Sequence, residues 1–95
     1  MSASEKPTAN SLLILREEFD DWAVLYDPDS GTGFGLNPVS AFIWNRLDGR
    51  HTLEDIVGEL RDQFSEVPPE VEEQVSEFVD ELVRRGFAGY EIEQV

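Results

Sequence analysis

The residues best suited to chemistry are few in this chain, and they do not form a catalytic set. The only histidine is His51, in the turn sequence "DGRHT". No cysteine is present, which excludes disulfides, thiolate catalysis and Cys-ligated zinc. A Ser-His-Asp arrangement needs a histidine held beside a nucleophile, whereas a histidine between a glycine and a helix cap has a solvated or capping role. The sequence therefore predicts no catalytic residue.

Carboxylates are the other candidates for chemistry, since 21 of the 95 residues are Asp or Glu. Those of the segment 69–85 follow the solvent side of an amphipathic helix, the usual position of such a charge run. The turn "DPDSG" at 27–31 is too short for a calcium loop and lacks that loop's terminal Glu. The sequence accordingly predicts no acid/base pair, no metal site and no cofactor. The helical carboxylates in question are Glu72, Glu73, Glu77, Asp80 and Glu81.

The charge balance limits the classes of partner. Seven basic residues against 21 acidic ones give a formal net charge of −14, which repels phosphate backbones and anionic lipid. We therefore expect no nucleic acid and no membrane surface as a partner. No apolar run approaches the ~18 residues of a membrane span, and the start "MSASEKPTAN" lacks the apolar stretch of a secretory signal. A cytoplasmic domain is expected.

The first half of the chain reads as three strands joined by short turns. Apolar residues cluster or alternate over 12–19, 22–26 and 32–37, with turn residues between these segments. Short connections favour an antiparallel meander with 22–26 in the middle. Both faces of that middle strand are apolar, and Trp22 and Trp44 are predicted to be core residues. Trp44 lies off the main apolar stripe of its helix, so an exposed contact surface is the alternative for it.

The second half reads as three helices, so the fold class is α+β. The first helix begins after the N-cap Asn37, with proline as its first residue, and closes at Gly49. The second is capped by Thr52, and the third runs over about 69–85, with Gly86 as its stop.

The expected organisation is a single domain between two tails. We expect a disordered tail over 1–11, one domain over 12–88 and a C-terminal tail over 89–95. The residue pattern of 87–95 leaves open whether this end forms a short strand or packs Phe87 and Tyr90 onto the core.

The order of three strands and three helices, carrying "GFGLNPVSAFIWNRLDGRHTLEDIVGEL" in its middle, resembles the PqqD family. These are small peptide chaperones, also described as recognition elements for ribosomally made, post-translationally modified peptides. The resemblance covers roughly residues 12–88. It rests on "LN" at the end of the third strand, the apolar first helix, "DG" after it, the helix from Thr52 to Leu60, and a third helix ending in "LVRRGF".

This resemblance implies a winged helix-turn-helix-like, non-catalytic domain that binds the leader of a precursor peptide. In such domains the leader adds as a strand beside the third strand, against the third helix, and is presented to a modifying enzyme, often a radical SAM enzyme. The acidity of the chain and its helix "NPVSAFIW" differ from the pyrroloquinoline quinone member, so the peptide is left open.

The third strand, "TGFGL", is the predicted binding edge. It carries no charge, although natural edges are commonly guarded by one. Its two glycines let another backbone approach closely, which suits strand addition. The alternative is that the glycines mark a bulge or a strained turn, with the edge covered by the N-terminal tail. The predicted peptide-binding residues of this edge are Thr32, Gly33, Phe34, Gly35 and Leu36.

The third helix is the predicted opposite wall. At ~100° per residue its apolar arc spans roughly 140°, wider than the ~100° of a core-facing stripe. One flank of this arc combines apolar and polar side chains, as expected for one wall of a peptide groove. Because the flank is acidic, a basic or amphipathic leader is expected. A wide core stripe that packs on both other helices and the sheet is the open alternative. The predicted wall residues are Glu72, Ser76, Val79 and Val83.

Two other functions compete with peptide capture. A winged-helix shape favours DNA, but a recognition helix presents basic and amide side chains. Here the third helix is acidic, with Arg84 and Arg85 only at its end, so charge argues against a DNA-binding regulator. A module that docks on a partner protein without any precursor peptide is the other alternative.

Overall fold

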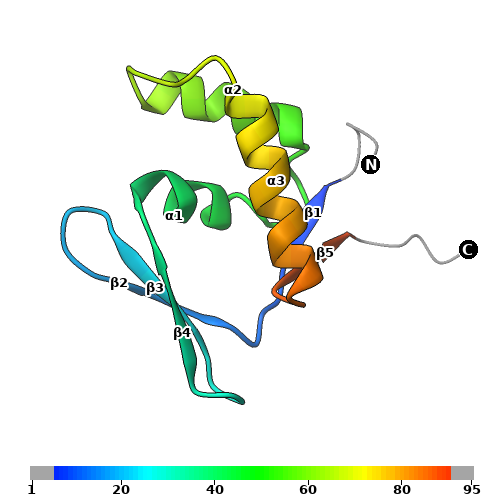
Figure 1. Ribbon diagram of the computed structural model, residues 1–95. Coiled ribbons are helices and arrows are strands. Elements are labelled where there is room, and N and C mark those ends of the chain that lie inside the picture. The colour runs from blue at the N-terminus through cyan, green and yellow to red at the C-terminus, as the bar shows by residue number, and fades with distance from the viewer. Residues whose placement is uncertain (1–5, 91–95) are drawn as a thin grey trace, which may run out of the picture.

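The computed structural model describes residues 6–90, which form three helices and two small sheets (Figure 1). The α+β class and the order of three meander strands followed by three helices are confirmed, but the strand order differs in part, because a further strand precedes the meander and another follows the helices. The winged helix-turn-helix description stays a prediction. The elements are β1 (Pro7–Ala9), β2 (Ile14–Glu17), β3 (Ala23–Asp27), β4 (Thr32–Leu36), α1 (Pro38–Asn45), α2 (Leu53–Gln63), α3 (Val71–Arg84) and β5 (Ala88–Tyr90).

β2, β3 and β4 form the predicted antiparallel meander, with β3 in the middle. Leu25 lies opposite Leu15 of β2 and Phe34 of β4, and these three residues form one row across the sheet. The next row contains Tyr26 and Gly33. Since successive residues of a strand point to opposite faces, the first row faces the core and the second faces outward.

The two faces of β3 differ in burial. Ala23 and Leu25 are only 2% and 1% exposed, whereas Trp22, just before the strand, is 51% exposed. The prediction of Trp22 as a core residue is therefore wrong, while Trp44 is buried at 7% exposure, as predicted. Both faces of this segment are apolar in sequence, and only the placement of the helices decides which face is covered.

The predicted N-caps of the first two helices are confirmed. The Asn37 side chain accepts the Ser40 N–H at 2.8 Å, ahead of Pro38 at the first helical position. Thr52 and Asp55 form a reciprocal capping box, each side chain accepting the other residue's N–H at 3.0 Å. These hydrogen bonds satisfy N–H groups that have no partner inside the helix.

α1 is shorter than predicted. It ends at Asn45, because the N–H of Arg46 bonds to the carbonyl of Ile43, three residues back, which tightens the last turn. Gly49 does not close the helix. It lies in the following turn with φ +77°, and its N–H donates to the Pro7 carbonyl at 3.1 Å.

α3 begins two residues later than predicted. The N–H of Val71 bonds to the Pro68 carbonyl at 3.1 Å, which places residue 69 in a turn before the helix. Gly86 follows the end of the helix with φ +79°, the left-handed conformation that its predicted role as a stop requires.

The two ends of the described chain pair with each other. β1 and β5 form an antiparallel ladder in which Pro7 lies opposite Tyr90 and Ala9 lies opposite Ala88. The expectation of tails over 1–11 and 89–95 is thus wrong for residues 7–9 and 89–90, and residues 1–5 and 91–95 lie outside the described ones. Pro7 is fully buried. Its burial and the backbone hydrogen bonds of the ladder hold β1 against β5.

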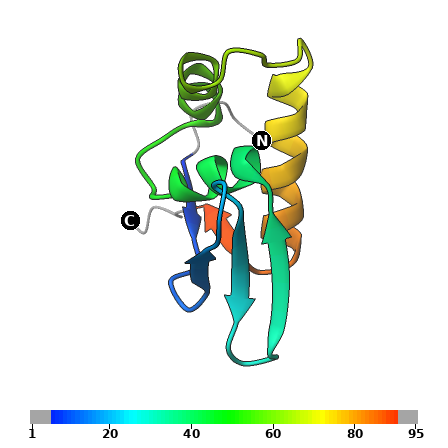
Figure 2. The ribbon, with the colours of Figure 1, turned by 90° about the vertical axis from the view of Figure 1, so that its left-hand side faces the viewer.

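One apolar core joins the sheet to the helices. Figure 2 shows α1 across one end of the meander and α2 beyond α1. No helix within residues 6–90 is long and apolar enough to cross a membrane. The buried core residues are Ala23, Leu25, Leu36, Ala41, Ile43, Trp44, Leu47, Ile56, Val57, Leu60, Val71, Val75, Val79, Leu82 and Ala88.

Candidate functional site

β4 has one unpaired side. The strand order β2–β3–β4 places it at the edge of its sheet, and β1 pairs with β5 instead of covering it. Within residues 6–90, no backbone hydrogen bond from outside the sheet reaches the segment 33–36. At the start of the strand, the Thr32 N–H is met by Ser30 Oγ at 3.3 Å. In the described part of the chain the N-terminal segment therefore does not cover this edge.

The direction of the free backbone groups follows from the β2–β3 hairpin. Glu18 donates its N–H to the Trp22 carbonyl at 2.7 Å, so these two residues face each other as a hydrogen-bonded pair. Such pairs recur at every second residue, and the residues between them direct their backbone groups to the opposite neighbour. Leu25 therefore bonds toward β4, where it lies opposite Phe34. The N–H and C=O groups of the two glycines that flank Phe34 point away from the sheet.

These glycines lie in regular strand, not in a bulge. Neither Gly33 nor Gly35 has a positive φ, and β4 pairs with β3 without interruption. A Cβ at Gly35 would meet no atom within 4 Å, while one at Gly33 would lie 3.3 Å from Val24 Cγ1. The alternative of a bulge or strained turn is wrong, and the missing side chains leave room for a second backbone.

Phe34 connects β4 to the C-terminal end of α3. Its ring packs edge-on against Phe87 with centroids 5.2 Å apart, and the Arg85 guanidinium carbon lies 4.5 Å from the Phe34 centroid. Glu81 holds Arg85 through a 2.7 Å contact between Oε2 and Nε, and its other oxygen binds Arg84 at 2.6 Å. Hydrogen bonds from Arg84 and Arg85 lower the pKa of the Glu81 carboxyl.

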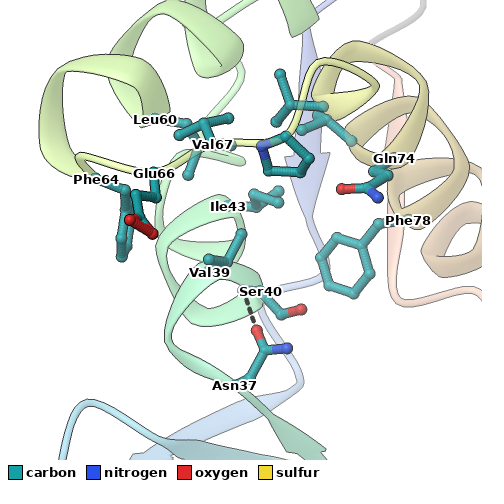
Figure 3. A pocket seen from close by; sticks show the side chains of 13 residues that line it. Asn37, Val39, Ser40, Ile43, Leu60, Phe64, Glu66, Val67, Gln74 and Phe78 are labelled. Atoms are coloured by element: carbon teal, nitrogen blue, oxygen red, sulfur yellow. Dashed lines mark hydrogen bonds between the residues drawn. The ribbon is translucent and has the colours of Figure 1, made fainter.

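An apolar cavity of about 270 Å³ opens beyond the other end of β4 (Figure 3). It lies between α1, α3 and the connection that joins α2 to α3. This volume is below the range of about 300–1,000 Å³ of sites for drug-sized ligands, and it is on the scale of one large side chain. The lining residues are Asn37, Val39, Ser40, Ile43, Leu60, Phe64, Glu66, Val67, Pro68, Val71, Gln74, Val75 and Phe78.

One side of α3 faces both the cavity and β4. Gln74 and Phe78 line the cavity, and Arg85, which follows the helix, reaches Phe34. At ~100° per residue these residues and Glu81 fall within about 60° of one another. We call the set Gln74, Phe78, Glu81 and Arg85 the α3 stripe.

The predicted wall residues lie on a different side of α3. Val79 is 0% exposed, so the prediction that it forms an open wall is wrong. Glu72, Ser76 and Val83 fall about 160–200° from Gln74 around the helix axis, and none of them lines the cavity. The apolar arc of the helix has two flanks. The flank that contains Gln74 and Phe78 faces the cavity, and the flank that contains the predicted wall residues does not.

Sequence reasoning missed the α3 stripe, although a signal was present. Its members recur at i, i+4, i+7 and i+11, the spacing of one helix face. The sequence does not show that this face is nearer to β4 than the opposite flank, because that depends on how α3 packs against α2 and β5.

His51 lies outside this site, in the turn between α1 and α2. Its Nδ1 is 2.9 Å from Asp48 Oδ1, and its Nε2 is 2.8 Å from Glu59 Oε2, whose partner oxygen binds Arg46 Nε at 2.7 Å. The hydrogen bond with Asp48 raises the pKa of His51. These contacts tie the turn to α2. Among residues 6–90, no group of three or more His, Asp or Glu side chains is arranged to hold a metal ion.

Comparison with known families decides the affiliation of the chain. The family described as "Coenzyme PQQ synthesis protein D (PqqD)" matches residues 23–88, well over half of the 95 residues. The chain belongs to the PqqD family. The matched part of this PqqD-family chain contains β3, β4 and all three helices, and thus the whole candidate site, whereas β1 and β2 precede it.

Solved structures similar to this PqqD-family chain include two leader-peptide complexes. TbiB1 in complex with the TbiA(beta) leader peptide has a TM-score of 0.71 and 26% identity, covering 90% of this chain and 99% of that one. Lasso peptide synthetase B1 complexed with the leader peptide has a TM-score of 0.72 and 26% identity, covering 88% and 98%.

The same fold also occurs inside a larger protein. The heterocyclase TruD has a TM-score of 0.64 and 20% identity, covering 96% of this chain but only 12% of its own. No curated protein sequence matches this chain.

Proposed function

We propose that this PqqD-family domain captures the leader of a ribosomally made precursor peptide as an added strand on β4 and presents it to a modifying enzyme. The observation that carries the proposal is the unpaired edge of β4 next to an apolar cavity. The two leader-peptide complexes of similar fold support it. The proposed contact residues of the edge are Thr32, Gly33, Phe34, Gly35 and Leu36.

Strand pairing alone does not account for tight binding. The outward backbone groups of the two glycines offer about four hydrogen bonds, each with a net value of about 0.5–1.5 kcal/mol. Micromolar affinity needs about 8 kcal/mol. Burial of one large apolar side chain adds about 1.5–3 kcal/mol, and the cavity is the place for it. We therefore expect the leader to carry a large apolar or aromatic residue that enters the cavity.

We infer that the domain is a non-catalytic, cytoplasmic adaptor without a cofactor of its own. The lack of a catalytic residue set in the sequence and the family membership support this role. The modifying enzyme is a radical SAM enzyme or another peptide-modifying enzyme, and the radical SAM class rests on the family resemblance. The net charge of −14 and Glu66 beside the cavity favour a leader that is basic or amphipathic near its anchor residue.

Titration of the isotope-labelled protein with the leader peptide encoded beside its gene tests the site. We expect NMR shifts over residues 32–36 and around the cavity. Gly35→Pro should weaken binding at least about tenfold, because it removes an outward N–H while leaving the bonds between β3 and β4 in place. Gly35→Ala is the matched control. It keeps the N–H, and its Cβ would meet no atom within 4 Å, so binding should stay near that of the natural protein.

Two outcomes would contradict the proposal. One is a set of shifts confined to the turn 48–52, with residues 32–36 unchanged. The other is an equal loss of affinity in the proline and alanine variants, when thermal unfolding shows that both are folded.

A further inference from the structure

Two arginines gather at the C-terminal end of α3 in a strongly acidic chain, beside the carboxylates of Asp80 and Glu81. Among residues 6–90, the carboxylate of Glu81 is the one that forms an ion pair with both Arg84 and Arg85, whereas the chain as a whole has a formal charge of −14. The two side chains are 68% and 45% exposed. Each guanidinium has five N–H donors, so one shared carboxylate leaves most of them available to a ligand.

Arg85 lies where an added strand would place its side chains. Its guanidinium stacks on Phe34 at 4.5 Å, and Phe34 belongs to the row of the sheet that faces the core. A peptide that pairs with the free groups of the two glycines extends the sheet, so every second side chain falls on this same face. The one opposite Phe34 therefore lies beside Arg85.

The other end of the site has the opposite character. The cavity is mainly apolar, with Glu66 among its lining residues (Figure 3). Glu72 and Glu73 stand in the first turn of α3 at this end, but on other sides of the helix, so Glu66 is the acidic residue that lines the site. The charge along the site thus changes from acidic beside the cavity to basic at Arg85.

We infer, on the basis of the proposed function, that Arg85 recognises an acidic side chain of the bound peptide and thereby fixes its direction and register. A peptide antiparallel to β4, the commoner pairing, has its apolar anchor at the cavity and its C-terminal part at Arg85. Since inward positions recur at every second residue, the Asp or Glu follows the anchor by roughly two or four positions. Arg85 then binds this carboxylate together with Glu81 or in place of it.

A display library of random short peptides, selected on the immobilised full chain, supplies the probe. We expect selected peptides to carry Asp or Glu at a fixed spacing after a large apolar residue. In fluorescence anisotropy with one such peptide, replacing its acid by the matching amide should weaken binding about three- to tenfold, and less at high salt. This comparison needs no protein variant, so it does not depend on how any variant folds.

Two arginine variants locate the contact. Arg85→Gln should abolish both the preference for an acidic residue in the selected peptides and the loss of affinity when that residue is replaced by its amide. Arg84→Gln is the matched control, because it changes the net charge equally and removes a contact to the same Glu81, but Arg84 is not the residue stacked on Phe34. It should keep the preference.

The two proposals fail in different ways. Selected peptides without an acidic preference, or equal effects of the two arginine variants, would overturn the role of Arg85 and leave strand addition intact. Selected peptides whose binding is unaffected by Gly35→Pro, or a selection that yields no peptide, would refute the proposed function and the role of Arg85 with it.

Discussion

At the scale of single residues, His51 is held between two carboxylates and is expected to make stability depend on pH. Its hydrogen bond with Asp48 raises its pKa above the ordinary 6.5. Protonated His51 therefore stabilises the fold fully below pH 6.5, and this contribution is lost as the pH rises through the raised pKa. The same contact lowers the pKa of Asp48 below 3.8, so its contribution is present above pH 3.8 and is lost as the pH falls through the lowered pKa.

Urea unfolding at pH 5.5 and pH 8.5 measures this effect. We expect the free energy of unfolding to be higher at pH 5.5, by about 1 kcal/mol or less, because solvent screens these partly exposed groups. In the His51→Gln variant, the difference in the free energy of unfolding between the two pH values should shrink to the part contributed by the other titratable groups. Identical pH profiles for the natural protein and the variant would contradict the expectation.

At the scale of elements, the capping box of α2 is the clearest local determinant of the fold. Thr52→Ala removes the oxygen that accepts the Asp55 N–H, and we expect it to lower the free energy of unfolding by about 1 kcal/mol. For a domain of this size that corresponds to a fall of about 4–8 °C in the melting temperature. Thr52→Ser keeps the hydroxyl and should melt close to the natural protein. A melting temperature for Thr52→Ala equal to that of Thr52→Ser would show that the cap is not needed.

The same elements show what a sequence can and cannot predict. The caps at Asn37 and Thr52 and the three meander strands were predictable because their signals lie within a few residues. The exposed position of Trp22 was not, since the strand it precedes is apolar on both faces. Nor was the α3 stripe, because the helix period defines two flanks of the apolar arc, and only the packing of α3 against α2 and β5 decides which flank faces β4.

At the scale of the whole molecule, the β1–β5 ladder joins residues about 80 positions apart, which no local pattern reveals. Deleting residues 1–10 removes buried Pro7 and the whole of β1. We expect a loss of about 2 kcal/mol or more, or a fall of about 8 °C or more in the melting temperature. Peptide binding at β4 should survive, because that edge belongs to the other sheet. An unchanged melting temperature would mean that the pairing contributes nothing.

A point variant in the same strand provides the control for this deletion. The Thr8 hydroxyl is buried without a hydrogen-bond partner among the described residues. Its removal in Thr8→Ala should leave the melting temperature unchanged or raise it slightly. Destabilisation by both changes would instead indicate a general sensitivity of this segment.

Because β1 and β5 pair with each other in a sheet of their own, the two ends of the described segment 6–90 lie together, and neither β1 nor β5 pairs with the edge of β4. Such a unit is modular: it can be inserted between the segments of a longer polypeptide or exist as a separate gene product, with the edge of β4 unpaired in either case. The occurrence of the same fold within a much larger heterocyclase agrees with this geometry. If an enzyme were fused to either end, it would no longer have to meet the bound peptide by diffusion. Its effective concentration at the peptide would be set by the length and stiffness of the linker.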